Sequence, residues 1–220
     1  MNSNAPLIFK KARGAFTLIE ILIVMSLIVL LFGITSQLIT SVGQSQGRSR
    51  ARADLELIAS GLEAFSGKYG GYPRLSCAAN EKFGAGEIYK CLTGKMAMKY
   101  EGGQIVMYEL SFQSTPFVDS TKLMLGDPSD EYLTDVDPEK SGVYFVDPWR
   151  NPYLYFYDTS TTQTTINSSW RSATFILLSK GPDGEEADVL SMYSTGIIPD
   201  YLDYTGKQEN VDNIIQGRDE

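Results

Sequence analysis

Residues 10–32 read KKARGAFTLIEILIVMSLIVLLF, and this stretch sets the architecture of the chain. After the basic start, residues 16–32 are apolar except for Thr17, Glu20 and Ser26. From Phe16 to Val42 is 27 residues, and a helix of that length, at about 1.5 Å per residue, spans the apolar core of a bilayer. A carboxylate at that depth costs about 2.5–3.5 kcal/mol on insertion scales, so Glu20 is expected to have a partner or a function.

A basic start followed by an apolar core is also typical of a secretory signal peptide. Such a peptide would be cut after the apolar core, where Gly33–Ser36 offers small residues. The small pair Gly14-Ala15 instead lies before the core, which favours cleavage there and retention of the apolar helix. A plain single-pass anchor explains the length and the flanking bases but not Glu20.

This order of features resembles the N-terminus of the type IV pilin and pseudopilin superfamily. The resemblance rests on a basic leader, a small residue, Phe-Thr-Leu-Ile-Glu at 16–20 and a long apolar helix. It implies that a prepilin peptidase cuts the chain between Ala15 and Phe16 and that the new N-terminus is methylated. The family has Gly before the cut, but cleavage after Gly14 would place Glu20 one residue too late for the family pattern. The resemblance also implies a filament subunit in which Glu20 pairs with the N-terminal amine of a neighbouring subunit.

The distribution of bases predicts the topology. Lys10, Lys11 and Arg13 precede the apolar segment, and the next base is Arg48. The positive-inside rule then places the N-terminus in the cytoplasm and the rest of a single-pass inner-membrane protein in the periplasm. The sequence predicts a leader at 1–15, a membrane and filament-core helix at 16–42, a continuation of the helix at 43–66 and a globular domain at 67–220.

Composition excludes several functions. The chain has 27 acidic and 19 basic residues, for a net charge of −8, and loss of the three leader bases would take this to about −11. Such a surface is poorly suited to phosphate backbones, so no nucleic acid is expected as a partner. The absence of His excludes Ser-His-Asp and Cys-His catalysis and His-ligated zinc, and we predict that the protein is not an enzyme.

The chain contains two cysteines, Cys77 and Cys91. Both follow the predicted membrane helix, so they would meet an oxidising periplasm, where disulfides form and persist. A Cys77–Cys91 disulfide is expected, and the alternative is two buried thiols.

Hydrophobic periodicity predicts an α+β fold, and the resemblance to pilins implies that this fold is of the pilin type. Past the membrane segment, five apolar residues recur at helical spacing and form one stripe, which indicates an amphipathic helix that packs on a domain. They are Leu55, Ile58, Ala59, Leu62 and Phe65. Strand signals at 104–112, 143–146, 153–157 and 174–178 predict a small antiparallel sheet on this helix. Residues 115–142 are acidic and rich in Pro, which is typical of a surface loop.

A second resemblance is narrower. The sequence DPWRNPY at 147–153, LSKGPDG at 178–184 and GGYP at 70–73 resembles the major pseudopilin of type II secretion, which has D-P-W-G-N-P-Y and a Ser-x-Gly-x-Asp-Gly turn. It implies a pseudopilus subunit assembled on an inner-membrane platform, with further copies and other pseudopilins, to help export folded proteins. The alternatives are a type IV or minor pilin for adhesion, motility or DNA uptake, and an enzyme or sensor on a membrane anchor.

The same resemblance implies a calcium site. In that family the loop after the Asp-Gly turn binds calcium, a cation that takes 6–8 oxygen ligands and suits a flexible loop. The matching residues here are the carbonyl of Lys180, the carboxylate of Asp183 and the pair Asp212-Asn213, with Asp188 as a closer alternative in sequence. The family has an acidic pair where Asp212-Asn213 stands, and a long insertion separates the two halves of the site in this chain. The other interpretation is that Asp183 and the following Gly make a turn.

Overall fold

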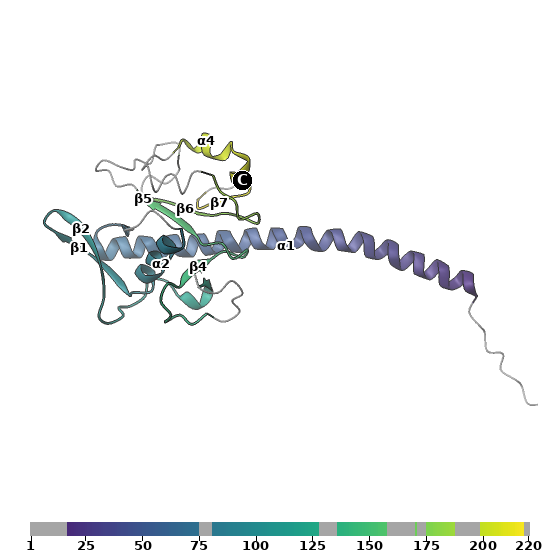
Figure 1. Ribbon diagram of the computed structural model, residues 1–220, viewed down its shortest axis with the longest axis horizontal. Coiled ribbons are helices and arrows are strands. Elements are labelled where there is room, and N and C mark those ends of the chain that lie inside the picture. Colours follow the sequence, from purple (N-terminus) through teal and green to yellow (C-terminus); the bar gives the residue numbers. More distant parts are fainter. Residues whose placement is uncertain are drawn as a thin grey trace, which may run out of the picture. The chain divides into compact units, whose positions relative to one another are not determined.

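A computed structural model describes residues 17–74, 81–127, 136–157, 170, 175–187 and 199–217, and of residues 34–42 and 81–83 it describes the backbone alone. The chain divides into two compact units, residues 1–43 and 44–220. The fold is α+β, with an N-terminal helix followed by small antiparallel sheets, as predicted (Figure 1).

Helix α1 runs from Leu18 to Tyr69 over 52 residues. It continues through Gly67 and stops before Gly70, which has φ +82° and whose N–H donates to the Ser66 carbonyl at 2.8 Å. The predicted end at residue 66 was therefore three residues too early. A single Gly costs a helix only about 1 kcal/mol, whereas the left-handed backbone at Gly70 stops it.

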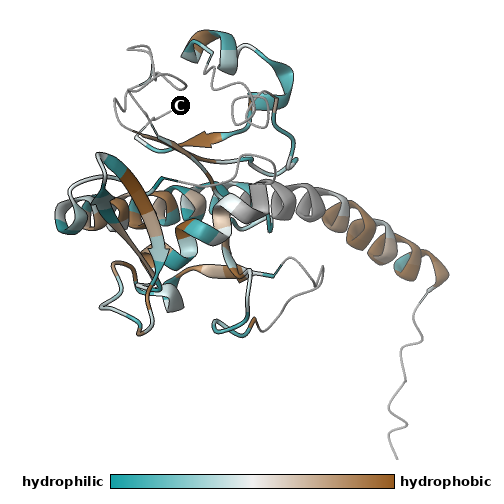
Figure 2. Cartoon of the chain, turned by 60° about the vertical axis from the view of Figure 1, so that its left-hand side comes forward, coloured by the Kyte–Doolittle hydropathy of each residue, from teal (hydrophilic) through white to brown (hydrophobic). Residues whose placement is uncertain are grey.

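In the first unit, α1 presents an uncovered apolar surface. The large apolar side chains between Leu18 and Phe32 are 49–83% exposed, and Figure 2 shows this part of the helix in brown. Among the described residues, no helix combines the length and apolar character that crossing a membrane requires. The predicted membrane helix at 16–42 includes residues 34–42, whose side chains lie outside the description, and it stays a prediction.

In the second unit, the C-terminal half of α1 lies in the core. All five residues of the predicted stripe are buried, at 0–5% exposure, which confirms it. Figure 1 shows this half of α1 running between the β5–β6–β7 sheet and the β3–β4 pair. Side chains from both sides join it in one apolar cluster, among them Phe145, Tyr155 and Leu177.

The strands form three small antiparallel sheets among the described residues rather than the single sheet predicted. One pairs β1 (Met96–Glu101) with β2 (Gln104–Glu109), and another pairs β3 (Met124–Gly126) with β4 (Tyr144–Val146). The third joins β5 (Leu154–Tyr157), β6 (Phe175–Ser179) and β7 (Ile214–Ile215). The other elements are α2 (Glu81–Leu92), η1 (Ser120–Lys122), α4 (Tyr201–Thr205) and η2 (Gln208–Asn210).

The described part of 115–142 is more than a surface loop. It contains η1 and β3, and its Val118 and Leu123 are buried in the cluster around α1. The acidic composition of the segment concealed these two apolar positions. This segment packs closely against α1, because a Cβ added at Gly61 would overlap the Val118 side chain.

We expect Gly61→Ala to destabilise the protein by about 1–3 kcal/mol, because overpacking forces the neighbouring side chain to move. Gly67→Ala is the matched control, since a Cβ there has nothing within 4 Å. That substitution should stabilise the same helix by about 0.5–1 kcal/mol. Urea unfolding of the full chain in detergent measures both, and a Gly61→Ala variant as stable as the control would contradict the packing.

Candidate functional site

The N-terminal candidate site is a capping box at the start of α1. The Thr17 hydroxyl accepts a hydrogen bond from the Glu20 N–H at 3.3 Å, and a Glu20 carboxylate oxygen accepts from the Thr17 N–H at 3.3 Å. This reciprocal pair satisfies donors that the first turn of a helix leaves open. The predicted cleavage residues Ala15 and Phe16 lie outside the described residues.

The second candidate site begins with the turn at 147–153, which is organised by a buried carboxylate. Asp147 is fully buried, and its Oδ1 accepts hydrogen bonds from the N–H groups of Trp149 at 3.0 Å and Asn151 at 2.8 Å. This is the hydrogen-bonded turn chemistry typical of Asp. Burial raises the pKa of Asp147, and the hydrogen bond from Ser179 works in the opposite direction.

Hydrogen bonds join this turn to the second motif, at 178–184. The Ser179 hydroxyl donates to Asp147 Oδ2 at 2.6 Å, and Asn151 Nδ2 donates to the Gly181 carbonyl at 3.1 Å. A Cβ at Gly184 would lie 2.9 Å from Asn151 Oδ1, so the two turns are in close contact. The two motifs of the narrower resemblance therefore form one structural unit.

The turn also contacts the central helix. A Cβ at Gly47 of α1 would lie 2.8 Å from Cζ2 of Trp149, so the indole approaches the helix backbone closely. The Tyr153 hydroxyl donates to Asp54 Oδ2 at 3.1 Å, and the Arg50 Nε lies 3.8 Å from the same oxygen. These contacts fix the turn against α1.

The predicted calcium residues Asp183 and Asp212 lie together, although 28 residues separate them in the sequence. The Asp183 N–H donates to Asp212 Oδ2 at 3.3 Å, and a Cβ at Gly181 would lie 2.5 Å from the Asp212 carbonyl oxygen. Burial raises the pKa of Asp212, and the nearby Asp183 carboxylate adds to this effect. Lys180 directly precedes this turn, whereas Asp188 lies outside the described residues.

Asp183 also forms a turn with Gly184, which the sequence offered as the alternative to a calcium site. Its Oδ1 accepts a hydrogen bond from the Glu185 N–H at 2.9 Å, and Gly184 has φ +70°. A carboxylate has two oxygens with about four lone-pair positions, so the Asp183 side chain can accept the hydrogen bond of the turn and still have lone pairs for other contacts.

Asn213, the fifth predicted residue, is 6% exposed and is held by two residues that the sequence did not single out. Its Nδ2 donates to the Tyr204 hydroxyl at 2.9 Å and to Asn210 Oδ1 at 3.2 Å. Among the described residues, Asp212 Oδ1 and Asn213 Oδ1 are buried and accept no hydrogen bond. Within the same described ranges, no group of three or more His, Cys, Asp or Glu side chains is arranged to hold a metal ion. Amide or backbone oxygens would have to complete such a site.

Cys91 is buried on α2, and Cys77 lies outside the described residues, so the Cys77–Cys91 disulfide stays a prediction. In the reduced form, burial would raise the pKa of the Cys91 thiol to about 12.

Comparison with known proteins identifies one region of the chain. Residues 10–36 match the prokaryotic N-terminal methylation motif. No curated protein and no solved structure matches the chain. The motif includes the leader bases, Phe16 and Glu20, and it supports a type IV pilin-like protein that undergoes prepilin processing and N-methylation and assembles into filaments.

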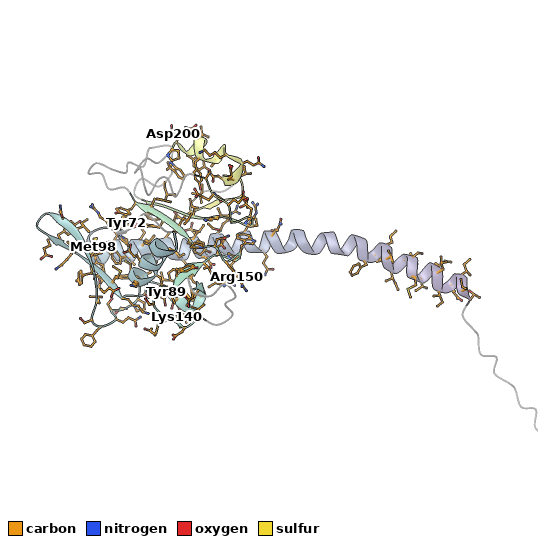
Figure 3. The ribbon with its side chains drawn as sticks, in the orientation of Figure 1. Tyr72, Tyr89, Met98, Lys140, Arg150 and Asp200 are labelled. Atoms are coloured by element: carbon orange, nitrogen blue, oxygen red, sulfur yellow. The ribbon has the colours of Figure 1, made fainter. Side chains whose placement is uncertain are left out.

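Arg150, labelled in Figure 3, has φ +74°, where the resembled family has Gly. A side chain in this left-handed region costs about 1–2 kcal/mol. We expect Arg150→Gly to raise the free energy of unfolding by about 1 kcal/mol. Arg150→Ala is the control, because it removes the side chain and keeps the strain. Thermal melts compare them, and equal melting temperatures for the two variants would refute the expectation.

Asp54 should make stability depend on pH, because burial raises its pKa above 3.8. A carboxyl group whose pKa is higher in the folded state than in the unfolded state stabilises the fold when it is protonated. This stabilisation is complete at pH values below the unfolded-state pKa and is lost as the pH rises through the folded-state pKa. Between pH 4 and pH 7, wild type should therefore lose more stability than Asp54→Asn, whose amide oxygen still accepts from Tyr153. Urea unfolding across this range tests the difference, and parallel profiles would contradict it.

Proposed function

We propose that the protein is a structural subunit of a type II secretion pseudopilus. The N-terminal methylation motif supports a pilin-like filament protein. The observation that favours a pseudopilin is the contact between the Asp-Pro-Trp turn and the Ser-x-Gly-x-Asp-Gly turn, through the 2.6 Å bond from Ser179 to Asp147. Both motifs resemble the major pseudopilin pattern, and here hydrogen bonds join them to each other.

In this proposal, the subunit starts as a single-pass inner-membrane protein with its globular domain in the periplasm. A prepilin peptidase removes residues 1–15, and an assembly platform adds the subunit to a filament with copies of itself and other pseudopilins. The exposed apolar side chains between Leu18 and Phe32 would pack against the equivalent helices of neighbouring subunits. The function is structural, with no catalytic residue.

The decisive experiment compares the secreted proteins of wild type with those of a deletion strain, alongside twitching and DNA-uptake assays. The pseudopilin proposal predicts that specific exoproteins accumulate in the periplasm while motility and uptake continue. Normal secretion with lost motility or uptake would instead identify a type IV pilin.

Glu20 would recruit an incoming subunit by pairing with its N-terminal amine. An ion pair between apolar helices is directional because the local dielectric constant is low, so its main contribution is register rather than net stability. The same side chain caps its own helix. A test of the pairing must therefore separate charge from capping.

We expect Glu20→Gln to block assembly, because it removes the charge while Gln still suits a capping box. Glu20→Val should remove both functions and leave membrane insertion intact. Filaments are measured by shearing and immunoblotting in cells that lack the wild-type protein. Normal assembly of the Gln variant with failure of the Val variant would show that capping suffices and would refute the ion pair.

We further propose that Asp183, Asp212, Asn213 and the carbonyl of Lys180 bind calcium. These donors fit the cation, because Asp212 Oδ1 and Asn213 Oδ1 are buried and accept no hydrogen bond from the described residues. The carboxylates of Asp183 and Asp212 also repel each other, and a bound cation would relieve this repulsion. Calcium would thereby hold the β6 and β7 ends of the loop together.

Calcium should raise the melting temperature of the full chain at pH 7, by an amount equivalent to about 2.7 kcal/mol at a concentration one hundred times Kd. Asp183→Asn and Asp212→Asn should each remove most of this shift. Asp203→Asn is the control, because this exposed residue of α4 has no place in the site. A shift that survives both site substitutions would place the ion elsewhere.

A further inference from the structure

The chain from Glu185 to Val211 separates the two halves of the proposed calcium site. Its described parts, 185–187 and 199–211, contain α4 and η2, and Asp200 before α4 is labelled in Figure 3. Two of its side chains, Tyr204 and Asn210, are 0% and 2% exposed. Both contact Asn213, so this insertion reaches a proposed ligand.

The backbone fixes the orientation of the Asn210 amide. Its Oδ1 accepts from the Ala187 N–H at 2.8 Å, and its Nδ2 donates to the carbonyls of Tyr204 at 2.8 Å and Ala187 at 3.3 Å. A reversed amide would place an oxygen against two carbonyls and an N–H against an N–H. Asn210 therefore presents an acceptor oxygen toward Asn213.

This orientation determines that of Asn213. The amide has two N–H donors, and both are used, one on Asn210 Oδ1 at 3.2 Å and the other on the Tyr204 hydroxyl at 2.9 Å. Its Oδ1 points the other way and is a buried acceptor without a donor among the described residues. Leaving such a group unsatisfied is unfavourable, whereas an amide oxygen is an ordinary calcium ligand.

We propose that Tyr204 and Asn210 are positioning residues for the calcium site, an inference that rests on the calcium binding proposed above. They hold the Asn213 amide so that its oxygen faces the ion. The same contacts require an amide at this position, because a carboxylate would direct one of its oxygens at Asn210 Oδ1. This explains why Asn213 stands where the resembled family has an acid, and it makes the insertion part of the site.

The experiment is a calorimetric titration of the full chain in detergent with calcium chloride at pH 7, with melting in chelator measured in parallel. Tyr204→Phe removes only the hydroxyl and keeps the ring, whose centroid lies 5.4 Å from that of Trp170. Tyr201→Phe is the matched control, since its ring also lies 5.4 Å from Trp170. Loss of one hydrogen bond should raise the calcium Kd of Tyr204→Phe about fivefold and leave that of Tyr201→Phe unchanged.

A third variant, Asn213→Ala, separates this inference from calcium binding itself. Weak binding by Asn213→Ala together with wild-type binding by Tyr204→Phe would overturn the positioning role and leave the calcium site in place. A lower melting temperature of Tyr204→Phe in chelator, with an unchanged Kd, would show a merely structural role and also overturn it. Absence of calcium binding by wild type would overturn both proposals.

Discussion

The buried carboxylate of Asp147 is the interaction on which the C-terminal half of the domain depends. It accepts two backbone hydrogen bonds within its own turn and the Ser179 hydroxyl from the end of β6. Removing a charged group from water is unfavourable unless its lone pairs are satisfied, and here they are. The turn, the sheet and the loop after β6 are therefore fixed by one side chain.

The strand ladder explains how the proposed calcium site could tolerate a long insertion. Ser179 pairs with Ile214 and Leu178 with Ile215, so β7 returns to β6 directly beside the turn at Gly181. The entropy of closing a flexible loop grows only with the logarithm of its length, so extra residues add little unfavourable free energy. The insertion also buries Tyr204 against Leu154, Phe156 and Leu178, which offsets part of that loss.

The sequence predicted those elements of the fold that depend on interactions between residues close together in the chain. The apolar stripe on α1, the strand signals and the N-terminal motif all appear within a few turns of helix or a few residues of strand. The joining of Asp183 with Asp212 was predicted by resemblance, and the structure brings the two together. The roles of Tyr204 and Asn210 were not predicted, because a buried Asn has no sequence signature and its contacts depend on where the insertion returns. The burial of Val118 was missed for a similar reason, since it lies in an acidic, Pro-rich segment that predicted a surface loop and its contact is with Gly61.

The capping of α1 by Glu20 and the ion pair proposed for the same side chain would together place a constraint on assembly. Within the subunit its carboxylate accepts from the Thr17 N–H and hydroxyl, each at 3.3 Å, which are long distances for bonds to a charged acceptor. Cleavage before Phe16 would create an amine one residue before Thr17, so the Glu20 carboxylate of an isolated subunit would lie close to its own N-terminus along the chain. In the proposed filament, an incoming subunit would offer a second amine of equal charge, and exchange between the two would leave the number of buried charges unchanged. The free energy of pairing with a neighbour is then a small difference between similar interactions. If the proposed pairing forms, the position of the neighbouring amine would select the register, and the strength of the filament would have to come from the apolar side chains around the pair.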